Sequence, residues 1–262
     1  MDLELVGKRV LVTGSHRGTG QIIAKQFAAE GAQVILHGMT QDQIAQARAE
    51  VSIADAVWGD ISTSQGTQEV LDQLQALGHD LDILVNNYGT AAPGEWGQLS
   101  TEKWITIYQH NVLSASRLID ALLPQIKASK QGRIINLGTI GSTRPNAKMP
   151  HYYAAKGALA NLTVSLAKAL AGYNSTVNLV SPGLIRTPEV ESQYARIAQK
   201  KGWGETFQEA EQQITANYFA NPLERIATRE EVADVVLFLA SARASFVNGQ
   251  NIRVDGGAVD IV

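Results

Sequence analysis

Tyr152 and Lys156 stand four residues apart at the start of an alanine-rich stretch that favours a helix. In a helix this spacing places the phenol and the ammonium on one face, about one turn apart. A phenol with an ordinary pKa of about 10 is a poor acid at neutral pH, and a nearby cation favours its ionised form. Tyr152 is therefore a candidate proton donor, and Lys156 is the cation that would lower its pKa. Because the same spacing arises by chance on solvated helices, its interpretation depends on the rest of the chain.

The chain alternates short β-branched runs with longer amphipathic stretches. These are the elements that would position Tyr152 and Lys156. Near-continuous apolar runs are typical of strands covered on both faces, as in a parallel sheet. The alternation predicts an α/β fold, a Rossmann-type doubly wound sheet in a single domain over residues 1–262. Strands are expected at 9–13, 33–36, 57–60, 83–85, 133–137 and 176–180, and helices at 21–30, 64–76, 102–128, 152–171 and 232–240.

The segment 188–222 interrupts this rhythm, because it is polar and charged and contains no predicted strand. Thr206 and Glu209 have the spacing of a capping box, which predicts a helix that begins there and runs towards Phe219. A helical insertion of this length in a compact domain is often a lid over a site, and we expect a substrate lid at 188–222. The alternative is a plain surface excursion. Its aromatic side chains suit either an apolar pocket wall or a packed lid helix.

Composition excludes several classes of function. The 262-residue chain is 45% hydrophobic with a net charge of −3, a balance that gives no field for recruiting nucleic acid or an anionic membrane. It has no cysteine, which rules out disulfides, thiolate chemistry and cysteine-based zinc sites, and its five histidines lack ligand spacing. We expect no metal. The N-terminus lacks the features of a signal peptide and no apolar run approaches ~18 residues, so the expected location is the cytoplasm.

A glycine-rich turn directly follows the first predicted strand. Its sequence, Thr-Gly-Ser-His-Arg-Gly-Thr-Gly over residues 13–20, leads into the helix expected from Gln21. Glycines at such a turn let backbone N–H groups approach a pyrophosphate at a helix N-terminus. The Gly-x3-Gly-x-Gly spacing differs from the dinucleotide fingerprint, and a ligand-free turn remains the alternative. Asp60 and the run Asn86-Asn87-Tyr88-Gly89 follow other strands, at the sheet edge where ligands of such folds bind.

Taken together, these segments resemble the short-chain dehydrogenase/reductase family over nearly the whole chain, from about Lys8 to Gly257. The glycine turn matches Thr-Gly-x-x-x-Gly-x-Gly, with Thr19 where isoleucine is usual. Residues 86–89 match Asn-Asn-Ala-Gly, with Tyr88 in place of alanine. The resemblance implies a cofactor site made by Gly14, Ser15, Arg17, Gly18, Thr19, Gly20, His37, Thr40, Asp60, Ile61, Asn87, Gly89, Tyr152, Lys156, Pro182, Gly183, Ile185 and Thr187.

The resemblance also implies hydride transfer between a nicotinamide cofactor and a ketone or secondary alcohol. Tyr152 would be the proton donor, Lys156 would lower the Tyr152 pKa and hold the nicotinamide ribose, and Asn111 would be tied to a proton-relay water. The family's catalytic serine falls on Thr139, thirteen residues before Tyr152. A threonine hydroxyl has the same donor and acceptor capacity. Ser142 is a nearby alternative at the wrong spacing.

The expected cofactor is NADP, with NAD as the alternative. NAD-dependent relatives carry a carboxylate after the second strand, whereas this chain has His37, Met39 and Thr40 there. A carboxylate at this position would repel the 2′-phosphate of NADP. Because this chain has none there, that discrimination against NADP is absent. Arg17 resembles the basic residue of NADP-dependent relatives, and its guanidinium suits a phosphate. His37 and Thr40 would add hydrogen bonds.

The expected substrate is a small carbonyl compound or alcohol, and the close alternative is a 3-oxoacyl thioester. A rival of another class is a nucleotide-binding regulator without turnover, favoured only by Thr139 in place of serine. Relatives commonly form homotetramers, so we expect a homotetramer or homodimer that uses the helices 102–128 and 152–171. Residues expected to line the substrate pocket are Tyr88, Ala91, Thr139, Ile140, Met149, Tyr152 and Leu184.

Overall fold

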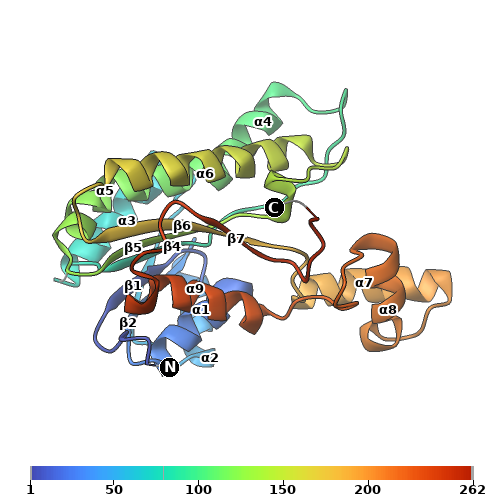
Figure 1. Ribbon diagram of the computed structural model, residues 1–262, viewed down its shortest axis with the longest axis horizontal. Helices are drawn as coiled ribbons and strands as arrows, with labels where there is room; N and C mark the ends of the chain where they lie inside the picture. Colours follow the sequence, from blue (N-terminus) through green and yellow to red (C-terminus); the bar gives the residue numbers. More distant parts are fainter. Residues whose placement is uncertain (1, 79, 261–262) are drawn as a thin grey trace.

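The computed structural model describes residues 2–78 and 80–260 and has a parallel sheet at its centre (Figure 1). The strands are β1 (Arg9–Val12), β2 (Gln33–Gly38), β3 (Asp55–Trp58), β4 (Ile83–Asn86), β5 (Gly132–Leu137), β6 (Ser175–Pro182) and β7 (Asn251–Val254). They lie in the order β3-β2-β1-β4-β5-β6-β7, and all neighbouring strands are parallel. The predicted doubly wound sheet is confirmed. Its switch point lies between β1 and β4.

Helices cover both faces of the sheet (Figure 1). One layer holds α1 (Gly18–Ala29), α2 (Gln41–Glu50) and α9 (Arg229–Ala240), and the other holds α3 (Ser64–Ala76), α5 (Ser114–Ala128) and α6 (Pro150–Ala169). Alternate residues of a strand serve opposite layers: Val10 and Val12 join the cluster under α1 and α9, whereas Leu11 joins the cluster under α3 and α5. This alternation explains why the strands are apolar throughout.

The helix expected over 102–128 is interrupted. α4 (Thr101–Tyr108) and α5 are joined by a π-helical turn, η1 (Gln109–Leu113), which contains Asn111. The Asn111 amide Nδ2 donates to the carbonyl oxygens of Ile107 and Thr90, each at 2.9 Å. A π-helical turn accommodates one extra residue in the helix, often at a functional site. Here the turn brings Asn111 against the loop that follows β4.

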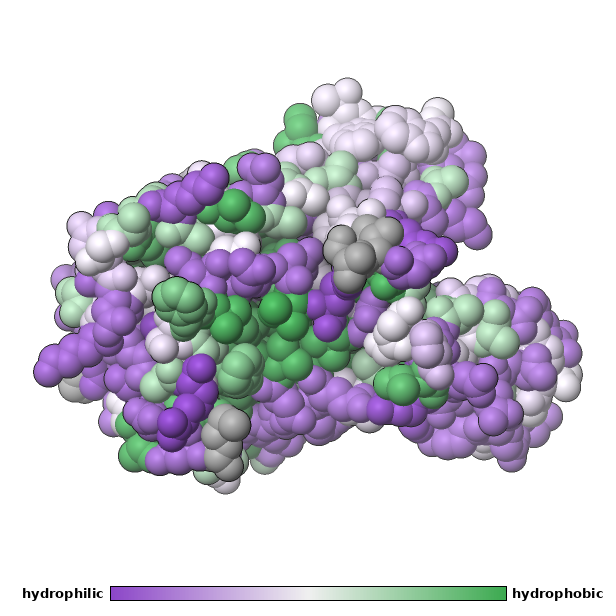
Figure 2. Space-filling model, in the orientation of Figure 1, coloured by the Kyte–Doolittle hydropathy of each residue, from purple (hydrophilic) through white to green (hydrophobic). Residues whose placement is uncertain are grey.

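Helices α7 (Pro188–Lys201) and α8 (Phe207–Tyr218) project from one side of the body (Figure 1). No strand lies within 188–222 in this fully described stretch, as predicted, and the capping box of Thr206 and Glu209 begins α8. The buried side chains of the two helices form a cluster separate from the sheet cores. Figure 2 shows the surface hollowed between this pair and the lobe that carries α4.

Several elements depart from the expected pattern. β3 ends at Trp58, two residues before the expected end of that strand, and α2 was not predicted. β7 was not predicted, since Asn251 and Arg253 break its apolar run and the strand is only partly buried. β2 runs two residues further than the expected 33–36, which places His37 inside a strand. Within residues 2–78 and 80–260 no helix is long and apolar enough to cross a membrane.

Candidate active site

The glycine turn between β1 and α1 forms a tight, closed loop. Gly14 and Gly18 have φ of +64° and +63°, a region that favours glycine. A Cβ on Gly20 would lie 2.4 Å from Nδ2 of Asn87. That amide donates to the carbonyl oxygens of Thr13, at 2.9 Å, and Gly14, at 3.3 Å, and so ties the loop to the end of β4. The loop opens into the N-terminus of α1, whose N–H groups suit a pyrophosphate.

Ser15 and His37 support this loop from inside the protein. Both side chains are fully buried. The backbone N–H of Gly14 donates to Nδ1 of His37 at 3.0 Å, Nε2 of His37 contacts the Gly59 carbonyl oxygen at 3.1 Å, and the hydroxyl of Ser15 accepts from the His37 N–H at 2.9 Å. Burial lowers the His37 pKa to about 4, which keeps the ring neutral. Both ring nitrogens of His37 are bonded to backbone groups of the protein, so neither is free for the hydrogen bond to the cofactor that we expected from His37. The Ser15 side chain likewise braces the loop.

Arg17, by contrast, is exposed at the outer end of the loop. Its Nη1 lies 3.0 Å from Oε1 of Glu189, in the first turn of α7. Thr40 is also exposed, and its hydroxyl accepts from the Gln43 N–H at 3.3 Å to cap α2. No carboxylate lies between His37 and Thr40. The glycine turn therefore carries an exposed cation, and the segment after β2 carries a hydroxyl and no carboxylate up to Thr40.

The loop after β3 provides the next wall. Oδ1 of Asp60 accepts from the N–H and the hydroxyl of Ser62, at 2.9 Å and 2.6 Å, while the Ile61 side chain is buried. Tyr88 turns towards this wall, with its ring centroid 6.1 Å from that of His110 and with burial raising its pKa to about 12. Tyr88 packs against the core under α3 and α5. It therefore faces away from the place where we expected it to line a substrate pocket.

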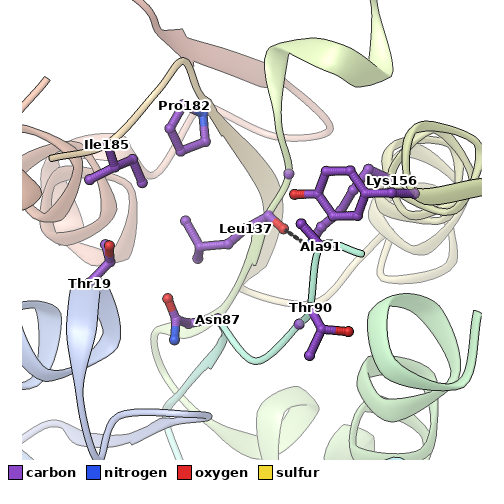
Figure 3. A pocket seen from close by; sticks show the side chains of 11 residues that line it. Thr19, Asn87, Thr90, Ala91, Leu137, Lys156, Pro182 and Ile185 are labelled. Carbon is purple, nitrogen blue, oxygen red and sulfur yellow. Dashed lines mark hydrogen bonds between the residues drawn. The ribbon is translucent and has the colours of Figure 1, made fainter. Parts of the chain in front are cut away.

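A cavity of about 140 Å³ lies at the carboxyl ends of β4, β5 and β6 (Figure 3). It brings together predicted residues from four separate segments of the chain. Thr19 and Asn87 face it from the side of the glycine turn, opposite Lys156 and Ala91 (Figure 3). The residues that line it are Thr19, Asn87, Gly89, Thr90, Ala91, Leu137, Gly138, Tyr152, Lys156, Pro182 and Ile185.

Lys156, Asn111 and Gly89 meet at one side of the cavity. Nζ of the buried Lys156 donates to the carbonyl oxygen of Leu137 at 2.7 Å (Figure 3). A Cβ on Gly89 would lie 2.6 Å from Oδ1 of Asn111 and 3.2 Å from Nζ of Lys156. Only glycine leaves room for the amide and the ammonium to approach the same stretch of backbone.

Burial dominates the electrostatics of the pair. It raises the pKa of Tyr152 to about 12, with a smaller contribution from the charge of Tyr153, and lowers the pKa of Lys156 to about 8. We expected Lys156 to lower the Tyr152 pKa. Burial raises that pKa instead, and Lys156, whose Nζ is bonded to the Leu137 carbonyl oxygen, is not among the groups that shift it.

Thr139 follows β5 and begins the short 3-10 turn η2 (Ile140–Ser142). Its Oγ1 accepts from the Gly141 N–H at 3.3 Å, while the hydroxyl of Ser142 donates to the Thr139 carbonyl oxygen at 2.7 Å. Ser142 is thereby held within the turn. A Cβ on Gly141 would lie 2.1 Å from the ring of Tyr153, so Tyr153 packs directly on this turn.

The segment after β6 leads from the cavity to α7. Pro182 and Ile185 line the cavity, and the Gly183 N–H donates to the Val254 carbonyl oxygen at 3.0 Å. Oγ1 of Thr187 accepts from the Val190 N–H at 3.3 Å and caps α7. The predicted cofactor residues Pro182, Gly183, Ile185 and Thr187 thus lie in the segment that leads directly into α7.

Sequence reasoning missed Thr90 and Leu137. The Thr90 N–H donates to Oδ1 of Asn111 at 3.2 Å, and its hydroxyl lies 2.9 Å from Nδ1 of His110. Leu137 acts through its backbone carbonyl, which leaves no side-chain signal. Thr90 directly follows the Asn-Asn-Tyr-Gly run, and its position beside Gly89 was the only available signal.

Known proteins resemble this chain over its full length. The family model described as Enoyl-(Acyl carrier protein) reductase matches residues 14–259. An uncharacterized oxidoreductase of Bacillus subtilis, YvaG, is 35% identical over 99% of this chain and 98% of its own length. The 3-oxoacyl-[acyl-carrier-protein] reductase FabG of Vibrio cholerae is 33% identical over 97% and 98%. The structure of L-sorbose reductase from Gluconobacter frateurii, complexed with NADPH and L-sorbose, aligns over all of both chains with a TM-score of 0.92 and 30% identity.

Proposed function

Because the chain belongs to the short-chain dehydrogenase/reductase family and is an NADP-dependent oxidoreductase acting on a ketone or secondary alcohol, we propose that Tyr152 is its proton donor. The observation that carries this proposal is the convergence of Tyr152, Lys156 and Gly89 at one cavity beyond the carboxyl ends of the strands. Ligands of doubly wound sheets bind at that edge.

The site residues fit a nicotinamide dinucleotide. The glycine turn leads into the N-terminus of α1, whose N–H groups suit a pyrophosphate, and Lys156 offers an ammonium at the cavity for a ribose. When bound, this cofactor supplies or accepts the hydride. The protein's part is then to orient the carbonyl carbon, exclude water and deliver a proton.

Tyr152 delivers that proton in the reductive direction. A phenol whose pKa is about 12 stays protonated at neutral pH and donates a hydrogen bond to the carbonyl oxygen. Thr139 donates a second hydrogen bond to the same oxygen as negative charge develops there. Lys156 holds the nicotinamide ribose, and Asn111 holds the loop around Thr90 at the path by which a proton returns to Tyr152.

NADP fits the rim of the site better than NAD does. Arg17 offers an exposed guanidinium at the end of the glycine turn, Thr40 adds a hydroxyl, and no carboxylate lies between His37 and Thr40 to accept ribose hydroxyls. An equal affinity for NADH and NADPH would count against this assignment.

A small polar ketone is the favoured substrate class. The full-length similarity to L-sorbose reductase supports a polyhydroxylated ketone, and Thr139 carries a hydroxyl directly after Gly138, which lines the cavity. We assign the substrate contacts above the cavity to α7 and α8, the proposed lid over 188–222. The second candidate is a 3-oxoacyl thioester, supported by the 33% identity to the Vibrio cholerae reductase.

NADPH oxidation, followed by absorbance against both classes of substrate, tests the proposal. The panel contains ketohexoses and simple ketones in one arm and 3-oxoacyl thioesters in the other. We expect turnover of a ketohexose with NADPH and much weaker turnover with NADH. Turnover of thioesters alone would support the second candidate, a 3-oxoacyl thioester as substrate. NADPH binding without turnover of any carbonyl substrate would support the alternative of a nucleotide-binding regulator.

We further propose that the protein is a cytoplasmic homotetramer or homodimer. Helices α4 and α6 carry the exposed apolar side chains Ile105 and Val164, which are 55% and 42% exposed. The absence of cysteine fits a reducing compartment. Sedimentation velocity should give a species at least twice the 28.2 kDa mass of one chain, and a stable monomer would refute the assembly.

A further inference from the structure

One ion pair joins the glycine turn to α7. Nη1 of Arg17 lies 3.0 Å from Oε1 of Glu189, across a separation of 172 residues in the chain. The side chains are 71% and 60% exposed, so the pair sits at the open rim of the site. It links the segment that binds the cofactor to the first turn of the proposed lid.

The two members of the pair differ in how firmly they are held. Among residues 2–78 and 80–260, Glu189 is the only side chain that hydrogen-bonds or pairs with Arg17. Glu189 has further support, because its own backbone N–H at the N-terminus of α7, the Thr187 hydroxyl and the charges of Arg17 and Arg229 lower its pKa. Glu189 therefore keeps stabilising partners when Arg17 leaves, which makes the contact exchangeable.

The next carboxylate of α7 is used differently. Glu191 accepts from Nε of Arg186 at 2.5 Å, and Arg186 has a second carboxylate, Glu211, at 4.0 Å. This network lies wholly within 186–211 and stabilises α7 and α8 against each other. Of the two carboxylates in the first turn of α7, only Glu189 contacts the glycine turn.

We propose that Glu189 competes with the 2′-phosphate of NADP for Arg17, and that this exchange untethers α7 from the glycine turn. The inference rests on the proposed role of Arg17 as the phosphate ligand. In the free protein Glu189 occupies the guanidinium. A phosphate carries more negative charge and can accept two of its N–H groups at once, so it displaces the single carboxylate contact. Glu189 is thus a specificity-determining residue that weakens NADPH binding and leaves NADH binding unchanged.

The size of the effect follows from the exposure of the pair. Exposed ion pairs contribute about 0.2–1 kcal/mol, which corresponds to a change in affinity of roughly 1.4- to 5-fold. Because both charges face solvent, the effect shrinks as ionic strength rises. A role of Glu189 in packing would show no such salt dependence.

The first experiment measures the dissociation constants of NADPH and NADH by fluorescence titration for wild type, Glu189→Gln and the matched control Glu191→Gln. The control removes the same charge from the same helical turn without touching Arg17. We expect Glu189→Gln to bind NADPH about two- to fivefold more tightly at low salt, with NADH unchanged and Glu191→Gln close to wild type. Unchanged or weaker NADPH binding in Glu189→Gln, or an equal gain in the control, would overturn the proposal.

Arg17→Gln separates this inference from the cofactor assignment on which it rests. A large loss of NADPH affinity with unchanged NADH affinity supports Arg17 as the phosphate ligand, and the result for Glu189→Gln then decides the competition. If Arg17→Gln leaves the NADPH to NADH ratio unchanged, both the phosphate role and the competition fail. If Arg17→Gln behaves as expected and Glu189→Gln does not, only the competition fails.

Tryptic cleavage tests the tether without a complete cofactor. Lys200 and Lys201 end α7 and are exposed. We expect 2′,5′-ADP, which carries the 2′-phosphate but no nicotinamide, to speed cleavage there in wild type, whereas 5′-AMP does not. In Glu189→Gln cleavage should be fast with either nucleotide. Identical rates for the two nucleotides in wild type would overturn the tether.

Discussion

The sheet side of the site and the α7–α8 pair hold their side chains in different ways. On the sheet side, Lys156 and His37 are buried among strands and bonded to backbone atoms from other segments. In the α7–α8 pair, four buried residues form a separate cluster with Ile226, and salt bridges such as Arg186–Glu191 lie on the outside. The first arrangement holds side chains of the candidate site within the main core. The second packs around its own small cluster, so a change there need not displace the side chains on the sheet side.

The largest expected effect comes from the sheet side. Tyr152→Phe removes the proposed proton donor and keeps the ring, so kcat/KM should fall by about 10³-fold, within the range for a general acid. The dissociation constant of NADPH should stay within about twofold, because no other group of the site moves. A variant that keeps more than about a tenth of wild-type turnover would remove Tyr152 from this role.

Thr139 tests the sheet side more finely. Thr139→Ala removes a hydrogen-bond donor to the developing oxyanion and should lower kcat by about 10²-fold, whereas Thr139→Ser should stay within about threefold. The serine variant is the control, because it keeps the hydroxyl that also accepts from the Gly141 N–H. Equal losses in both variants would mean that the methyl group, rather than the hydroxyl, matters.

The separate core of α7 and α8 predicts a different outcome there. Phe207 is 3% exposed, and Phe207→Ala should cost about 3–5 kcal/mol of local stability. We expect KM for the ketone to rise about tenfold or more while Tm changes little. Leu84→Ala in β4 is the contrast, since it opens a cavity in the main core and should lower Tm clearly. Similar falls in Tm would show that the two regions unfold together.

The smallest expected effect concerns pH. Burial lowers the pKa of Lys156 to about 8, so its ammonium is present below pH 8 and is lost as pH rises through that value. If the ammonium holds the ribose, NADPH binding should weaken by up to about tenfold between about pH 7 and pH 9. Lys156→Met should bind weakly at both values with no such slope. A slope retained in that variant would assign it to another group.

The sequence predicted the main elements of both regions but not the surroundings of individual side chains. The doubly wound sheet and α8 followed from local patterns, namely strand–helix alternation and the capping box at Thr206. The role of His37 did not, because β2 continues two residues beyond its predicted end and carries the imidazole into the core. Likewise the raised pKa of Tyr152 reflects burial by residues far apart in the chain, whereas the sequence showed only a neighbouring lysine.

The π-helical turn η1 makes the site sensitive to chain length as well as to residue type. Removing one residue from 109–113 would restore an unbroken α-helical register from α4 into α5. The wide turn that carries Asn111 to Thr90 would then be lost, which would separate these two residues while both helices stay folded. A single-residue deletion would thus act as a geometric switch, which alters the active-site loop without replacing any functional side chain.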